Sequence, residues 1–134
     1  MRVVNGQNTI YANDLPAAMR FYTALGLEES FRYPSSGDIQ HIELRAGHFT
    51  LGIATVAAAR DEHGLDPHPG GGGIEIVLWV DDTDGLFTRA LELGAEPISS
   101  PRDFLQHLRV AWVKDPDGNP LQFVQDTREY PLSF

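Results

Sequence analysis

The stretch GQNTIYANDLPAAMRFYTALGLEE, residues 6–29, has the same pattern as IEIVLWVDDTDGLFTRALELGAEP, residues 74–97, which begins sixty-eight positions later. This offset aligns Asp14 with Asp82, and the glycine of LGLEE with the glycine of LGAEP. In each copy an aspartate suited to cap a helix follows an apolar strand, and a glycine follows the predicted helix, where a left-handed cap is favoured. The repeat predicts a fold built from two copies of one supersecondary unit.

Three further strands are predicted after each helix, because apolar runs alternate with breaks rich in Gly, Pro and Ser. The segment DPDGN at 115–119 is the strongest of these turn signals. The order βαβββ therefore occurs twice, which places the chain in the α+β class. The predicted strands after the first helix cover residues 27–33, 38–45 and 49–56, and those after the second cover 95–99, 107–113 and 120–125.

Apolar periodicity indicates which faces of these elements are buried. In the strand predicted over 74–80, Ile76, Leu78 and Val80 form an aliphatic face suited to lie under a helix. Glu75 and Trp79 then point to the opposite face, with Val77 between them. The apolar residues at helical spacing are Ala18, Phe21, Tyr22 and Leu25 in the first helix, and Leu86, Phe87, Ala90, Leu91 and Leu93 in the second.

The length of 134 residues suits a single domain. Within it we expect a first module over about 3–58, a linker over 59–73, a second module over about 74–125 and a tail over 126–134. Two histidines in the linker, His63 and His68, are expected to be solvated, with a mobile lid over a site as the alternative. The tail residues Tyr130, Leu132 and Phe134 pack either on the sheet or on a partner chain.

Composition excludes several classes of function. The chain has no cysteine, which rules out disulfides, thiolate zinc sites and cysteine nucleophiles and agrees with a cytoplasmic protein. Its formal charge of −9 disfavours nucleic acid and anionic membrane surfaces as partners. No apolar run approaches the length needed to span a bilayer. The charge serves solubility or, alternatively, favours a cationic small molecule.

Three motifs in fixed order resemble those of a known superfamily. NDLPAAMRFYTALGLEE, VDDTDGLFTRALELGAEP and VKDPDGNPLQFVQ together look like the glyoxalase, bleomycin-resistance and extradiol-dioxygenase proteins, also called vicinal oxygen chelate proteins. The resemblance covers about residues 4–125. It implies paired βαβββ modules forming a curled mixed sheet with an internal cleft, helices on the outer face, and a homodimer. Modules exchanged between chains and modules paired within one chain both remain open.

The resemblance also identifies four positions at which family enzymes hold a divalent metal. Here they carry Gln7, Thr50 (or Gly52 if the register slips), Glu75 and Gln122. Only the carboxylate is a good ligand, because amide and hydroxyl oxygens bind divalent cations feebly and no histidine occupies any of the four positions. We therefore expect no metal cofactor. A weakly held divalent metal would use Gln7, Glu75 and Gln122.

A metal-free cleft is expected to bind a small molecule instead. Tyr11 and Trp79 are repeat-related and fall on the predicted cleft face, where they can stack on planar or cationic ligands. Trp112 is a candidate third ring, on a face that the pattern leaves undecided, and all three rings could instead be core or interface residues. The full predicted ligand-binding set is Gln7, Tyr11, Thr50, Glu75, Trp79, Trp112 and Gln122.

Three functions compete at this stage. The first, by resemblance to antibiotic-sequestering members, is a non-catalytic protein that binds a planar or cationic compound in an aromatic, acidic groove. The second is a glyoxalase-like lyase or isomerase that uses Glu75 as general base or metal ligand. The third is a dimerisation or regulatory module whose cleft is filled by its own side chains. His41, next to Glu43 on a strand, either reaches the cleft or is an ordinary hydrogen-bonded residue.

Overall fold

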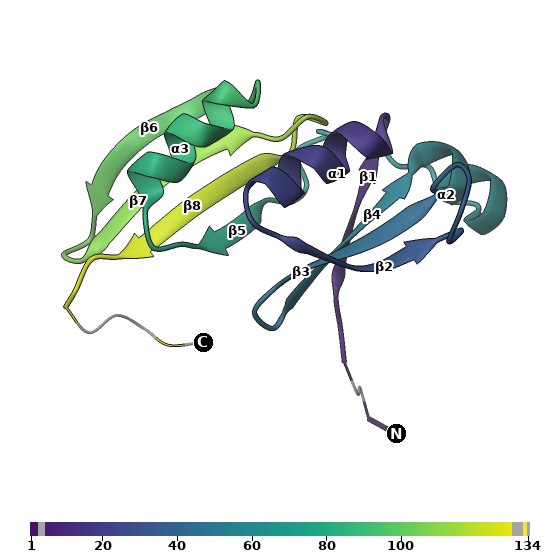
Figure 1. Ribbon diagram of the computed structural model, residues 1–134, viewed down its shortest axis with the longest axis horizontal. Coiled ribbons are helices and arrows are strands. Elements are labelled where there is room, and N and C mark those ends of the chain that lie inside the picture. Colours follow the sequence, from purple (N-terminus) through teal and green to yellow (C-terminus); the bar gives the residue numbers. More distant parts are fainter. Residues whose placement is uncertain (3–4, 130–132, 134) are drawn as a thin grey trace. The chain divides into compact units, whose positions relative to one another are not determined.

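The computed structural model describes residues 1–2, 5–129 and 133 and divides the protein into two compact units (Figure 1). Unit 1 is Met1–Pro69 and unit 2 is Gly70–Phe134. Each unit contains one βαβββ module with a four-stranded mixed sheet, which confirms the predicted α+β class and the tandem repeat. The tail predictions for Tyr130, Leu132 and Phe134 lie outside the described residues.

Unit 1 is a sheet with one helix on its face and a second helix after its last strand. The sheet order is β1-β4-β3-β2, with β1 parallel to β4 and the other pairs antiparallel. The elements are β1 (Asn8–Ala12), α1 (Leu15–Ala24), β2 (Glu28–Tyr33), β3 (His41–Ala46), β4 (Phe49–Thr55) and α2 (Val56–His63).

Unit 2 repeats this topology without a counterpart of α2 among its described residues. Its sheet order is β5-β8-β7-β6, with β5 parallel to β8 and the other pairs antiparallel. The elements are β5 (Ile76–Trp79), α3 (Thr83–Glu92), β6 (Glu96–Phe104), β7 (Leu108–Lys114) and β8 (Pro120–Asp126).

The two repeat helices begin and end as the sequence predicts. Asp14 caps α1 by accepting the backbone N–H of Ala17 at 3.0 Å, and Asp82 caps α3 by accepting the N–H of Gly85 at 2.9 Å. After each helix the chain turns through a glycine with positive φ, 116° at Gly26 and 95° at Gly94. The sixty-eight-residue offset therefore holds for both helices and both caps.

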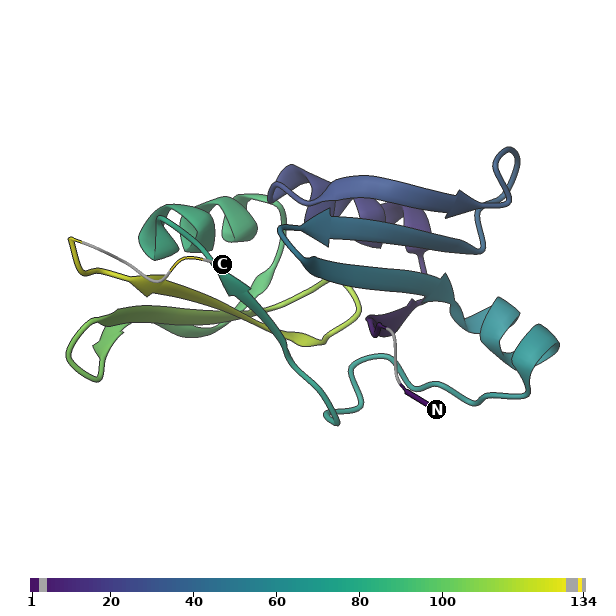
Figure 2. The same cartoon turned by 90° about the horizontal axis from the view of Figure 1, so that it is seen from below.

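Each sheet buries one face under its helix. In unit 1, α1 packs on β4, β3 and β1, and in unit 2, α3 packs on β7, β6 and β8 (Figure 2). The predicted alternation in β5 is confirmed, because Ile76 and Leu78 are buried whereas Val77 and Trp79 are exposed. The side chains buried between the helices and the sheets include Ile10, Leu15, Ala18, Phe21, Tyr22, Ile42, Leu44, Leu51 and Ile53 in unit 1, and Ile76, Leu78, Phe87, Ala90, Ala111, Val113, Leu121 and Phe123 in unit 2.

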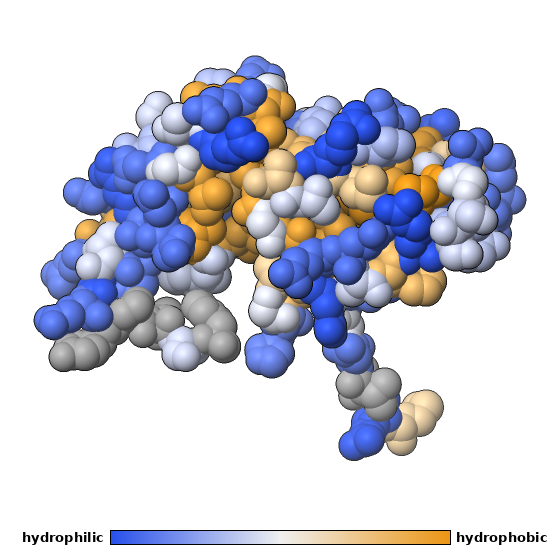
Figure 3. All heavy atoms as spheres, in the orientation of Figure 1, coloured by the Kyte–Doolittle hydropathy of each residue, from blue (hydrophilic) through white to orange (hydrophobic). Residues whose placement is uncertain are grey.

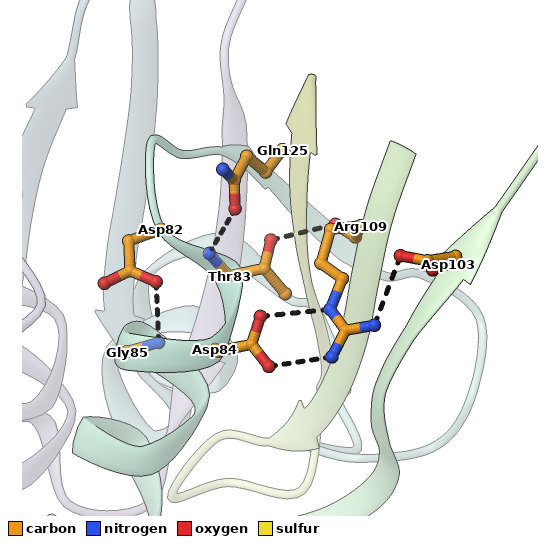
Figure 4. Close-up of polar contacts among 7 residues, drawn as sticks. All are labelled: Asp82, Thr83, Asp84, Gly85, Asp103, Arg109 and Gln125. Carbon is orange, nitrogen blue, oxygen red and sulfur yellow. Dashed lines mark hydrogen bonds and ion pairs between the residues drawn. The ribbon is translucent and has the colours of Figure 1, made fainter. Parts of the chain in front are cut away.

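Polar contacts fix the start of α3 to its sheet (Figure 4). The buried hydroxyl of Thr83 donates to the carbonyl of Arg109 at 2.8 Å, and the backbone N–H of Thr83 donates to Oε1 of Gln125 at 2.9 Å. The Arg109 guanidinium donates twice to the Asp84 carboxylate, at 3.0 and 2.9 Å, and once to Asp103 at 3.2 Å. These hydrogen bonds hold the pKa of Asp84 below its ordinary value and raise that of Arg109.

Three local features differ from the sequence prediction. Residues 59–63, expected in a linker, belong to α2, because Thr55 caps the helix by accepting the N–H of Ala58 and Gly64 ends it with φ 68°. Strand β6 extends to Phe104 rather than residue 99, through two irregularities in its pairing with β7. Leu91, expected on the buried face of its helix, is exposed, whereas Thr83 is buried there.

The surface of both units is mixed in character. Figure 3 shows hydrophilic side chains over much of the visible face, with hydrophobic atoms between them. Exposed large apolar residues occur in both units, among them Phe31 and Tyr33 on β2 and Phe104 on β6. None of the helices in the described part of the chain has the length and apolar character needed to cross a membrane.

Candidate ligand-binding site

The face of the unit 1 sheet opposite α1 carries the first group of predicted site residues. Strand alternation places Thr9 and Tyr11 of β1 on this open face, and Gln7 immediately precedes the strand. The register pairs Thr9 with Gly52 and Tyr11 with Ala54, so β4 contributes only small residues beside them. The side chains of β1 therefore project beside a low part of the open face, formed by Gly52 and Ala54, which we call the floor.

Gly52 lies at the centre of this floor. A Cβ built there would come within 2.6 Å of the Thr9 hydroxyl, 3.3 Å of Cε1 of His41 and 3.4 Å of Nε2 of Gln7. The three polar side chains thus converge over a position without a side chain. His41, which the sequence left undecided, faces the same side of the sheet as Gln7 and Tyr11.

The strand registers show which residue of unit 1 is the repeat counterpart of Gln122. Thr9 pairs with Gly52 in unit 1, and its repeat counterpart Val77 pairs with Gln122 in unit 2. The counterpart of Gln122 is therefore Gly52 and not Thr50, which was the primary choice from sequence. Thr50 lies on the same open face, two residues before Gly52 on β4, and pairs with Arg45 of β3.

The open face of unit 2 brings together four predicted residues. Trp112 donates its indole N–H to Oε2 of Glu75 at 3.2 Å, which settles the face of Trp112 that the sequence left undecided. Gln122 lies on β8, between β5 and β7, and pairs with Val77 on β5 and with Trp112 on β7. Trp79, on the same side of β5, is 43% exposed. The result is an aromatic surface with one anchored carboxylate.

An arginine that sequence reasoning missed completes this surface. The guanidinium carbon of Arg102 lies 5.5 Å from the ring centroid of Phe104 and 5.9 Å from that of Trp112, within the range of cation–π attraction. Arg102 pairs with Val110 across β6 and β7. The strand predicted over 95–99 ended before Arg102. The two-residue spacing of Arg102 and Phe104, which places both on one face of a strand, was the signal in the sequence that could have identified this arginine.

These residues do not suit a catalytic divalent metal. The four family positions carry two carboxamides, one carboxylate and one glycine, and a hard cation requires several carboxylates or imidazoles. The one carboxylate, Glu75, already accepts a hydrogen bond from Trp112. Within the described ranges 1–2, 5–129 and 133, no group of three or more His, Asp or Glu side chains is placed to hold a metal ion.

A separate cavity of about 450 Å³ lies within unit 1, where α2 meets the open face of the sheet. Tyr11 is the only predicted ligand-binding residue in its wall. His63, expected to be a solvated linker residue, ends α2 and lines the cavity, whereas His68 lies outside it with Nε2 3.3 Å from an Asp66 oxygen. The two linker histidines therefore have different surroundings.

Comparison with known proteins decides the family. The model described as the glyoxalase/bleomycin resistance protein/dioxygenase superfamily matches residues 5–123. The chain belongs to this superfamily. A comparison with curated proteins found no significant match.

Solved structures of other proteins share the fold at low sequence identity. A hypothetical protein from S. aureus is 20% identical, with a TM-score of 0.78 over 93% of this chain and 95% of its own. TioX from Micromonospora sp. ML1 is 21% identical, with a TM-score of 0.73 over 91% and 98%. A lactoylglutathione lyase from Agrobacterium tumefaciens is 23% identical, with a TM-score of 0.65 over 92% and 95%. At these identities the comparisons establish the fold alone.

Proposed function

We propose that this superfamily member binds a planar, positively charged organic compound on the open face of unit 2 and performs no chemistry on it. The observation that carries the proposal is the hydrogen bond between Trp112 and Glu75, which holds a carboxylate at the edge of an aromatic surface. Indole rings attract the face of a planar cation, and the carboxylate supplies the opposite charge. The formal charge of −9 increases the local concentration of such a ligand.

The polar residues around the carboxylate support binding rather than catalysis. Gln122 can orient a ligand by hydrogen bonds, but an amide neither transfers protons readily nor holds a divalent cation tightly. The Arg102 guanidinium, stacked against Phe104 and Trp112, borders the aromatic surface. A positive group at this border favours a ligand whose own positive charge lies toward Glu75.

Tryptophan fluorescence tests the proposal directly, because the only two tryptophans, Trp79 and Trp112, are both in unit 2. Proflavine, a planar cation, should quench it saturably at about 0.15 M salt, where exposed charges are screened beyond about 8 Å. Glu75→Gln keeps an oxygen for the Trp112 indole but removes the charge. It should weaken proflavine binding roughly three- to tenfold while changing binding of neutral acridine little.

Two matched variants control for general effects. Glu92→Gln removes a carboxylate from α3, and Leu91→Ala removes an exposed apolar side chain from the same helix. Neither should change proflavine affinity, whereas Trp79→Ala should weaken it about two- to tenfold through lost stacking. Equal losses of proflavine affinity in Glu75→Gln and Glu92→Gln would show that binding depends only on the net charge of the protein, and would contradict the proposal.

A second candidate function has one observation in its favour. The Trp112 hydrogen bond fixes the Glu75 carboxylate in one orientation, as a general base requires. If the protein is a lyase or isomerase, it should form or consume lactoylglutathione or a related thioester, and Glu75→Gln should abolish turnover without lowering the melting temperature. Turnover that survives Glu75→Gln would exclude Glu75 as the base.

A further inference from the structure

The cavity of unit 1 has a different origin from the open face of unit 2. Its floor is the end of the unit 1 sheet, where Tyr11, His41 and Ala54 lie on neighbouring strands, and its side is α2, which follows β4 directly. The small side chains of Ala58 and Ala59 line it from the helix. A volume of about 450 Å³ lies within the range of small-molecule pockets, roughly 300 to 1,000 Å³.

Three aromatic side chains, Tyr11, Phe31 and Tyr33, line the cavity. Phe31 and Tyr33, on β2, are 49% and 54% exposed. The Phe31 ring packs edge to face on the His41 imidazole, with centroids 6.2 Å apart. Tyr11 lies on the same face of the sheet. These rings leave accessible π surface, which attracts planar rings and cations.

The polar side chains of the cavity include two with hydrogen-bond acceptors, Gln40 and Glu62, and two imidazoles, His41 and His63. Gln40 lines it, and the side-chain oxygen of this residue is buried without a hydrogen-bond partner. An unsatisfied buried carbonyl costs about 1 to 3 kcal/mol, so a donor that reached it would be favoured. Glu62 adds a carboxylate from α2. Among the described residues that line the cavity, none is a lysine or an arginine.

We propose that this cavity is a binding site for an aromatic compound that carries a cationic amine, with the ring against Tyr11, Phe31 and Tyr33 and the amine toward Glu62 and Gln40. The site shares no residue with the open face of unit 2. Either site can therefore fail its test while the other stands.

Tryptamine and indole-3-acetate form a suitable probe pair, because they share one ring and carry opposite charges. In a two-dimensional NMR titration, tryptamine should shift the backbone signals of Tyr11 and Tyr33 and, most informatively, the side-chain NH₂ signals of Gln40. Indole-3-acetate should bind at least about tenfold more weakly. No binding of tryptamine at millimolar concentration, or shifts confined to unit 2, would overturn the proposal.

Variants on one helix separate the specific carboxylate from general charge. Glu62→Gln should weaken tryptamine binding roughly three- to tenfold, whereas Asp61→Asn, which removes the neighbouring carboxylate outside the cavity wall, should not. Tyr33→Ala is exposed enough to leave the fold intact and should weaken both probes alike. Equal losses from Glu62→Gln and Asp61→Asn, or an unchanged affinity in Tyr33→Ala, would count against the site.

Discussion

Single residues decide the chemistry that the open faces of this protein can support. A carboxylate at position 75 and carboxamides at 7 and 122 offer hydrogen bonds and one negative charge, whereas a chelating set needs several anionic or imidazole ligands. At the fourth position there is no side chain, because the register brings Gly52 to it. The donor chemistry of these four positions is therefore unlike that of a metal centre.

Gly52→Ala tests the crowding above this position. The added Cβ would lie 2.6 Å from the Thr9 hydroxyl, and a β-branched neighbour has few rotamers with which to give way. We expect a loss of about 1 to 3 kcal/mol in the free energy of unfolding, measured by urea denaturation. Gly73→Ala is the control, since nothing lies within 4 Å of its Cβ position, and it should be near neutral.

Asp84→Asn tests the pairing with Arg109. Because hydrogen bonds from Arg109 lower the pKa of Asp84 in the folded protein, the unfolded chain binds a proton more readily. The pair therefore stabilises the fold above the unfolded pKa of about 3.9, and this contribution is lost as the pH falls through the lower folded pKa.

The melting temperature of wild type should thus fall further between pH 7 and about pH 3 than that of Asp84→Asn. Glu92→Gln, which breaks the exposed ion pair with Arg89, should follow wild type. An Asp84→Asn profile parallel to wild type would show that the Arg109 contact carries no pH-dependent stability.

At the scale of elements, both repeat helices and most strands could be predicted from sequence, because each begins and ends at residues with strong local preferences. Asp14 and Asp82 cap their helices, and Gly26 and Gly94 follow them. Apolar alternation in β5 correctly assigned its two faces. In these places local propensity and tertiary packing agree.

The elements that sequence missed depend on tertiary context. The apolar residues of α2 form one run at its start, VAAA, and only Ala59 of the helix is buried, so helical periodicity gave no signal. The extension of β6 passes through pairing irregularities that break alternation. The sequence offered both Thr50 and Gly52, since a strand shift of two residues leaves the apolar pattern unchanged, and only the register chose Gly52. The aromatic cavity therefore could not be predicted without the structure.

Asp115→Ala tests the turn that joins β7 to β8. The buried Asp115 carboxylate accepts the backbone N–H groups of Asp117 and Asn119 at 2.9 and 2.8 Å and the Asn119 side chain at 3.0 Å. Its removal leaves these donors unsatisfied, and we expect a loss of about 1 to 3 kcal/mol in urea denaturation. Asp38→Ala, in an exposed loop, should stay within about 0.5 kcal/mol of wild type.

At the scale of the whole molecule, homodimerisation remains a prediction. It is supported by large apolar side chains exposed on unit 2, among them Ile98, Phe104 and Leu105. Light scattering coupled to gel filtration should give about twice the chain mass of 14.8 kDa. A mass of one chain at all concentrations tested would contradict it, and the proposed binding surfaces would then belong to a monomer.

The glycine at position 52 also constrains how a new metal-binding side chain could be introduced on the open face of unit 1. A donor side chain at 52 would collide with the Thr9 hydroxyl, which lies 2.6 Å from the position of its Cβ. Re-engineering would therefore need a paired change, with a smaller residue at position 9 introduced before or together with the new ligand. Libraries of single substitutions should therefore yield no stable variant with a donor side chain at position 52, whereas libraries that vary positions 9 and 52 together can yield one.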